Sequence, residues 1–445
     1  MPELKKLNLQ KFEDPEANPV ALAEGVDPEK YIIATYLMSF PADFNAYRVT
    51  QLLAIEQSTG TWTPVPGETP EVRKEHVGKV IGVYEYPDYS IMLPPDTEWR
   101  NYFVQIAFPE DNIGEQIAGL FTTVIGNISA GFGKVRLLDV RFPKKYVEGF
   151  KGPKFGIPGI RDVLGVYDRP LLNNMIKPCV YGPAKLGAKY AYEVAKGGVD
   201  IIKDDELLFN RPFNPVEERV TLFMEAIDKA YEETGEKTLY AVEVTDDVPR
   251  IFENIDTALE HGANCLLVNY IAAGWSVLRK IAEDPSVNVP ILAHSDVAGV
   301  YMASHEYGIN ANLVVGKFPR LLGADIVLVG APGGKVQFLE DKGWPIIDVL
   351  RYPFYHIKPV FPMASGGVYP SLVPSLIAGA GKDIVIGAGG GIHAHPMGPE
   401  AGAIAFRQAI DIVMKEGITS VRELRKYAKE NNVKELLTAL ETWKF

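Results

Sequence analysis

Cysteine, long hydrophobic runs and surplus basic residues are scarce or missing in this 445-residue sequence. The two cysteines, Cys179 and Cys265, cannot build a disulfide framework, which excludes a disulfide-stapled scaffold and fits a reducing compartment. The polar N-terminal segment lacks a signal-peptide core and no run could span a bilayer, so we expect a cytoplasmic protein without membrane partners. A net charge of -12 disfavours nucleic acid as a partner.

The length of the chain indicates two domains. Residues 1–150 alternate strand-like and helix-like segments, which predicts an N-terminal α+β domain of ferredoxin-like type, a sheet covered by two helices. Strands are expected at Tyr31–Phe40, Val77–Tyr86, Tyr102–Phe108 and Val135–Phe142, and helices at Ala42–Ile55 and Ile113–Ile125.

Residues 151–445 consist of short apolar runs separated by amphipathic helical segments such as Pro215–Thr234 and Ile255–His261. The eight runs are Asn173–Pro178, Val199–Glu206, Thr238–Val244, Asn264–Tyr270, Pro290–Ser295, Ala324–Gly330, Lys358–Gly367 and Asp383–Gly391. Their number and spacing predict an α/β fold, a closed (β/α)8 TIM barrel with C-terminal helices. An open doubly wound sheet is the alternative architecture.

The second run ends in four charged residues, Lys203-Asp204-Asp205-Glu206. Alternate residues of a strand face the same side, so Lys203 and Asp205 can point to one site at the strand end, and Glu206 can join them. Two carboxylates are hard ligands that suit Mg²⁺. A cationic lysine would repel the metal, whereas CO2 would convert it to an anionic carbamate ligand. A simple exposed charge cluster is the alternative.

Two further residues at strand ends could move protons. Lys177 ends the first run and could remove a proton α to a carbonyl, made more acidic by a bound metal. His294 ends the fifth run and could bind a substrate hydroxyl or transfer protons. A solvated lysine and a histidine bonded to the backbone are the structural alternatives.

Glycines follow the last two runs and could bring backbone N–H groups close to an anion. Ser365 precedes Gly366 and Gly367, and Gly389 to Gly391 follow the eighth run, where many barrels bind phosphate. The segment Ala331–Lys335 has the composition of a mobile loop that brings a lysine over the site. Ordinary tight turns are the alternative for each.

Taken together and in this order, these motifs resemble the RuBisCO large subunit and the RuBisCO-like proteins. The resemblance extends over most of the chain. It includes STGTW at 58–62, IGN at 125–127, GPKFGIPGIRD at 152–162, GGVDIIKDDE at 197–206, SGG at 365–367 and AGGGIHAHPMGPEAG at 388–402.

The resemblance implies a role for each matching residue. Lys203 matches the carbamylated lysine, and Asp205 and Glu206 match the Mg²⁺ ligands. Lys177 matches the lysine of enolisation, His294 a substrate-binding histidine and Lys335 the lysine of the mobile loop. Residues that match the pocket for the C1 phosphate are Thr61, Trp62, Gly367, Gly389 and Gly390. Glu56 and Asn127 match residues that complete the site of a partner subunit, which implies at least a homodimer.

Four positions depart from the carboxylating members: Met175, Cys179, Ser295 and Leu328. Ser295 and Leu328 replace an arginine and a histidine that hold the second phosphate of the bisphosphate. Two charge-assisted bonds to phosphate are lost, which would weaken bisphosphate binding by about 3–6 kcal/mol. We therefore expect a small-molecule sugar substrate with one phosphate and a less polar distal end.

The expected activity is Mg²⁺-dependent enolisation or isomerisation of a ketose or diketose 1-phosphate, as in the methionine-salvage branch with its methylthio-pentulose phosphates. Three alternatives stay open. They are an archaeal-type ribulose-1,5-bisphosphate carboxylase, a decarboxylase of a β-keto sugar-acid phosphate, and a non-catalytic protein on a relic barrel. The sequence leaves the distal group of the substrate and any assembly beyond a dimer undetermined.

Overall fold

The computed structural model describes residues 11–443 except 61–62, 64, 131–132 and 336–339. The chain forms two compact units. One comprises Met1–Phe150 and Val297–Val314, and the other comprises Lys151–Asp296 and Val315–Phe445. Among the described residues, no helix has the length and apolarity needed to cross a membrane.

The first unit is an antiparallel sheet with helices, in the order predicted for an α+β ferredoxin-like domain. Its long strands are β1 (Tyr31–Pro41), β2 (Lys79–Tyr86), β3 (Trp99–Pro109) and β4 (Lys134–Arg141), and its longer helices are α1 (Ala46–Glu56), α2 (Pro70–His76) and α3 (Ile117–Ile125). The strands lie side by side as β4-β1-β3-β2. Alternate residues of β1, from Ile32 to Met38, are fully buried, as expected for a sheet with one covered face.

A segment from the middle of the chain extends this sheet. Strand β10 (Gly308–Ile309) pairs in parallel with β4, after the short helix α11 (Ala298–Met302). The guanidinium group of Arg136 donates to the carbonyls of Tyr307 (2.9 Å) and Met302 (3.2 Å). The expected division at residue 150 did not include this excursion, because a two-residue strand has no periodic signal.

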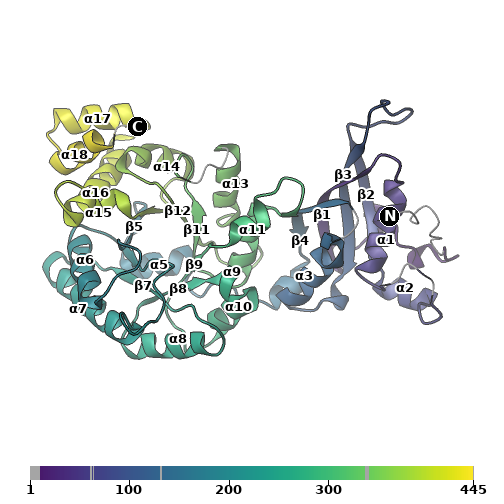
Figure 1. The fold of residues 1–445 in the computed structure, drawn as a ribbon, viewed down its shortest axis with the longest axis horizontal. Coiled ribbons are helices and arrows are strands. Elements are labelled where there is room, and N and C mark those ends of the chain that lie inside the picture. Colours follow the sequence, from purple (N-terminus) through teal and green to yellow (C-terminus); the bar gives the residue numbers. More distant parts are fainter. Residues whose placement is uncertain (1–10, 61–62, 64, 131–132, 336–339, 444–445) are drawn as a thin grey trace. The chain divides into compact units, whose positions relative to one another are not determined.

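The second unit is a closed parallel barrel, which confirms the predicted architecture and rules out the open sheet (Figure 1). Its strands are β5 (Leu171–Met175), β6 (Ile201–Lys203), β7 (Leu239–Glu243), β8 (Cys265–Asn269), β9 (Ile291–His294), β11 (Ile326–Gly330), β12 (Phe361–Ser365) and β13 (Val385–Ala388). Strand β13 pairs with β5 and thereby closes the ring.

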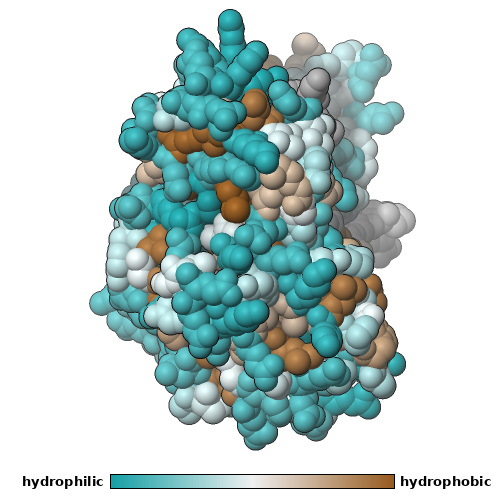
Figure 2. Space-filling view, turned by 90° about the vertical axis from the view of Figure 1, so that its left-hand side faces the viewer, coloured by the Kyte–Doolittle hydropathy of each residue, from teal (hydrophilic) through white to brown (hydrophobic). Residues whose placement is uncertain are grey.

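Helices surround the strands (Figure 1). The longer ones are α5 (Gly156–Leu164), α6 (Ala184–Lys196), α7 (Val216–Thr234), α8 (Arg250–Glu260), α10 (Trp275–Glu283), α13 (Glu340–Val349), α14 (Val373–Ala380), α16 (Pro399–Glu416), α17 (Val421–Glu430) and α18 (Lys434–Thr442). Short ones are α9 (Tyr270–Ala273), α12 (Phe318–Leu321) and α15 (Gly390–His393), whereas α4 (Lys144–Glu148) belongs to the first unit. In the view of Figure 2, hydrophilic side chains predominate and hydrophobic ones form small scattered groups.

The barrel interior changes from apolar to polar along five of its strands. Its core contains Leu171, Ile201, Leu239, Ala241, Cys265, Leu267, Leu292, Ile326, Phe361, Met363 and Val385. Two residues further along, where the same face continues, the last inward positions of five strands are polar: Lys203, Glu243, Asn269, His294 and Ser365. The barrel therefore gathers polar groups at the carboxyl ends of its strands, where barrel active sites lie.

Candidate active site

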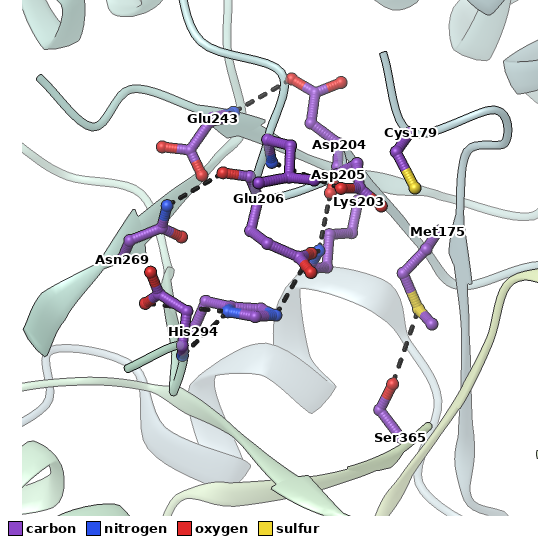
Figure 3. A network of polar contacts seen from close by, with 12 residues as sticks. Met175, Cys179, Lys203, Asp204, Asp205, Glu206, Glu243, Asn269, His294 and Ser365 are labelled. Carbon is purple, nitrogen blue, oxygen red and sulfur yellow. Dashed lines mark hydrogen bonds and ion pairs between the residues drawn. The ribbon is translucent and has the colours of Figure 1, made fainter. Parts of the chain in front are cut away.

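The charged turn after β6 lies at the centre of these polar groups (Figure 3). The ammonium group of Lys203 is fully buried and donates to the carbonyl of Asp204 (2.8 Å) and to Oε2 of Glu206 (3.0 Å). The carboxylate of Asp205 accepts a hydrogen bond from Lys177 Nζ at 2.5 Å. The structure thus brings the four predicted residues of the metal site and its base together.

A lysine lies beside each of the two carboxylates: Lys203 beside Glu206 and Lys177 beside Asp205. Burial alone would raise the pKa of Glu206, but the charges of Lys203 and His294 lower it to about 2. Burial alone would lower the pKa of Lys177, but its hydrogen bonds to Asp205 and Cys179 raise it above the ordinary lysine value. In this arrangement Glu206 is anionic and Lys177 is protonated.

The donor set fits Mg²⁺ on one condition. No group of three histidine, cysteine, aspartate or glutamate side chains able to hold a metal occurs in the part of the chain that the structure describes. Asp205 and Glu206 supply two hard oxygen donors, so a third anionic ligand is needed. A carbamate on Lys203, whose nitrogen already contacts Glu206, would supply it and would also remove a repelling positive charge.

Asp204, between the proposed ligands, has a structural role that the sequence reasoning did not identify. It points away from Lys203 and Asp205, and its Oδ2 accepts from Arg219 Nε at 2.9 Å, both side chains being fully buried. The hydroxyl of Tyr240 donates to the same carboxylate (2.9 Å), as does the backbone N–H of Glu243 (3.0 Å). Burial raises the pKa of Asp204, and the charge of Arg219 offsets part of that rise.

His294 lies at the end of β9 with its ring beside Glu206, in the charged turn after β6. Its Nε2 is 3.3 Å from Oε2 of Glu206. Its Nδ1 accepts a hydrogen bond from the backbone N–H of Asp296 at 3.2 Å, which places the ring proton on Nε2. His294 can therefore donate to a carboxylate or to a substrate oxygen at this position.

The glycine turns and the lysine loop pack together. The N–H groups of Ala331 and Lys335 donate to the carbonyls of Ser365 (2.8 Å) and Gly366 (2.7 Å). A Cβ on Gly367, whose φ is +73°, would approach the nitrogen of Lys335 to 2.7 Å, so only glycine allows this contact.

Helix α15 begins at Gly390, next to these turns. Its first N–H groups have no preceding helical turn to accept their hydrogen bonds. No other atom lies within 4 Å of a Cβ built on Gly390, and a Cβ built on Gly391 would meet the carbonyl of Val368. The space at Gly390 is therefore open, and Gly391 packs against the residue that follows the Gly366-Gly367 turn.

The residues predicted in the first unit are described only in part. Asn127 Nδ2 donates to Oε1 of Glu56 at 3.2 Å, so these two residues are neighbours, and their role at a partner's site stays a prediction. Thr61 and Trp62 lie outside the described residues.

The departures from the carboxylating pattern lie at the barrel mouth and interior. Leu328 points inward on β11 and packs against the barrel core. Met175 ends β5, where its sulfur is 3.9 Å from the hydroxyl of Ser365. The sulfur of Cys179 accepts from Lys177 Nζ at 3.1 Å.

The barrel thus carries carboxylates, lysines and glycine turns at the carboxyl ends of its strands, where the active sites of barrel enzymes lie. The chain belongs to the RuBisCO large-chain family. The family model described as "Ribulose bisphosphate carboxylase large chain, catalytic domain" matches residues 156–443, and the model of the corresponding N-terminal domain matches residues 24–146.

Named relatives indicate which branch of the RuBisCO family the chain resembles. A "Ribulose bisphosphate carboxylase-like protein" of Archaeoglobus fulgidus is 64% identical over 98% of this chain and 99% of its own. A "2,3-diketo-5-methylthiopentyl-1-phosphate enolase" of Geobacillus thermodenitrificans is 37% identical over 93% of this chain and 98% of its own. The octameric ribulose-1,5-bisphosphate carboxylase/oxygenase of Pyrococcus horikoshii superposes with a TM-score of 0.84 at 32% identity, covering 96% of each chain. The chain is a RuBisCO-like protein.

Proposed function

We propose that this protein is an Mg²⁺-dependent enolase that acts on a ketose or diketose 1-phosphate with an apolar distal group. The single observation that supports this most is the contact of Lys177 Nζ with the carboxylate of Asp205 at 2.5 Å. A base must lie beside the metal that polarises its substrate. The 37% identity to the Geobacillus enolase supports the same reaction class.

The proposed residues divide the work by position. Carbamylated Lys203, Asp205 and Glu206 would hold Mg²⁺, which polarises the substrate carbonyl and thereby acidifies the neighbouring C–H bond. Lys177 takes the α proton at Nζ, after passing its own proton to solvent. His294 donates from Nε2 to a substrate oxygen, and Lys335 closes the site on the phosphate side.

The phosphate would bind at the two glycine turns. Gly390 leaves room for an anion to approach the backbone, whereas a Cβ on Gly367 or Gly389 would meet Lys335 or Lys177. Ser365 and Gly366 fix the turn through their carbonyl bonds to the lysine loop. This region offers one phosphate pocket, which suits a monophosphate.

The distal end of the substrate would face apolar groups. Leu328 and Met175 occupy inward positions of β11 and β5, where a charged phosphate would lose its solvation without a cationic partner. A methylthio or alkyl group fits such surroundings better. This favours methylthio-pentulose phosphates, the substrate class of methionine salvage.

The test is exchange of the substrate α proton with deuterated solvent, followed by NMR in Mg²⁺ and bicarbonate. Lys177→Ala should abolish exchange of a methylthio-pentulose 1-phosphate, while Lys415→Ala, which changes an exposed lysine paired only with its neighbour, should retain it. Full exchange in Lys177→Ala would refute the base, and no exchange in the unmodified protein would refute the proposed reaction.

A carboxylase is the second candidate, favoured by the neighbouring Glu56 and Asn127. These residues match those that complete a partner's site in carboxylating members, and the Pyrococcus carboxylase is an octamer. We propose at least a homodimer for either activity. Incorporation of labelled CO2 into 3-phosphoglycerate from ribulose 1,5-bisphosphate would decide for the carboxylase.

A further inference from the structure

Glu206 lies outside the regular strand, so its position depends on side-chain contacts. Strand β6 ends at Lys203, three residues earlier. The carboxylate of Glu206 contacts Lys203 and His294, and the first of these contacts must change if Lys203 becomes a carbamate. An anchor that survives metal loading has to act on the backbone of Glu206.

Asn269 supplies such an anchor. It is the last residue of β8, points inward and is only 2% exposed. Its side-chain Nδ2 donates to the backbone carbonyl of Glu206 at 3.0 Å. In Figure 3 Asn269 and Glu243 lie on the side of Glu206 away from Lys203.

Asn269 is itself held by Thr245, two residues after the end of β7. Its backbone N–H donates to the hydroxyl of Thr245 at 2.9 Å, and the N–H of Thr245 donates to Oε1 of Glu243 at 2.6 Å. The N–H of Glu243 in turn donates to Asp204. Two strands therefore grip the metal-ligand turn at both ends, at Asp204 and at Glu206, with Asp205 between them.

Two buried oxygens lie beside these hydrogen bonds. Among the described residues, neither Oδ1 of Asn269 nor Oε2 of Glu243 has a hydrogen-bond partner. An unpaired buried acceptor lowers the stability of the folded state. A leucine at position 269 would avoid that cost, so the asparagine has another use.

We propose that Asn269 is a positioning residue for the divalent cation, acting through the backbone carbonyl of Glu206 and supported by Thr245. This inference rests on the metal site of the proposed function. Residues that orient metal ligands typically change metal affinity 10–100-fold when they are replaced. The inference adds a determinant of Mg²⁺ affinity that does not itself touch the ion.

The test measures Mg²⁺ dissociation constants of full-length protein by calorimetry in bicarbonate buffer. Asn269→Leu should weaken Mg²⁺ binding 10–100-fold with little change in melting temperature. The matched control is Asn264→Leu, just before the same strand, where Nδ2 donates to the carbonyl of Thr238 (3.0 Å) and Oδ1 accepts from Tyr240 N–H (2.7 Å). It should lower the melting temperature and leave the Mg²⁺ constant within about twofold.

A second pair of variants distinguishes loss of the positioning contact from misfolding. Thr245→Val removes the hydroxyl that holds Asn269 and should weaken Mg²⁺ binding in the same direction, and Thr245→Ser should restore it. Unchanged Mg²⁺ affinity in Asn269→Leu, or equal weakening in Asn264→Leu, would overturn the positioning role and leave the proposed function intact. Absence of Mg²⁺ binding by the unmodified protein would overturn both.

Discussion

Lys177 Nζ lies 2.5 Å from Oδ2 of Asp205, so the proposed base and a proposed metal ligand form an ion pair. This pairing opposes catalysis, because a base must be neutral to accept a proton. A divalent ion bound by Asp205 would compete for the same oxygen and weaken the hold on the lysine proton. Metal binding and activation of the base are therefore linked through one carboxylate.

The link predicts that Mg²⁺ and bicarbonate together increase the reactivity of Lys177 toward an amine-acylating reagent at pH 8. The hydrogen bond to Asp205 raises the pKa of Lys177, and loss of that bond removes this effect. Mass spectrometry of labelled peptides gives the measurement, with exposed Lys415 as the internal control. Equal labelling of Lys177 with and without Mg²⁺ would contradict the link.

The buried pair of Asp204 and Arg219 predicts a large stability effect. Arg219→Met leaves the Asp204 carboxylate unpaired in a site that is fully buried, and should lower the free energy of unfolding by about 3–5 kcal/mol. Denaturant unfolding measures this. The double variant Asp204→Leu and Arg219→Met should recover most of the loss, because it removes the charge together with its partner. A double variant as unstable as the single one would show that the loss comes from packing.

The sequence predicted the barrel because its strands are contiguous apolar runs that end in polar residues. It also predicted that Lys203, Asp205 and Glu206 lie at one strand end, whereas their binding of a metal stays a prediction. Two features were missed. Asn269 and Glu243 lie inside apolar runs, and such a run does not by itself indicate which face of the strand each polar side chain occupies. The excursion at 297–314 was missed because its pairing with β4 is long-range and only two residues long.

The open space over Gly390 predicts a selective loss of phosphate binding. A methyl group there meets no protein atom within 4 Å, so Gly390→Ala should fold normally but occupy the space proposed for the anion. Phosphate-ester affinity, measured by calorimetry with a ketose 1-phosphate, should fall at least tenfold. Gly299→Ala, which also meets nothing within 4 Å, is the control and should bind normally. Normal affinity in Gly390→Ala would place the phosphate elsewhere.

Asp325, which directly precedes β11, predicts a pH dependence of stability. Its carboxylate accepts from the N–H groups of Phe155 (2.8 Å), Gly156 (2.8 Å) and Ile291 (3.0 Å). Burial nevertheless raises its pKa to about 6, above the ordinary value of 3.8. The folded state thus binds more protons than the unfolded state between these values, so this group reduces stability as pH rises through that window.

The shift of roughly two pH units corresponds to about 3 kcal/mol. Asp325→Asn removes the titration and should lose about 1–3 kcal/mol at pH 4, because its amide nitrogen cannot accept from Ile291 N–H. Relative to the unmodified protein, the variant should then gain stability from pH 4 to pH 7. Urea unfolding at each pH measures this difference, with Asp228→Asn, on the exposed side of α7, as the control for loss of one carboxylate. A difference between variant and unmodified protein that stays constant across this range would show that Asp325 is already ionised at pH 4 in the folded state.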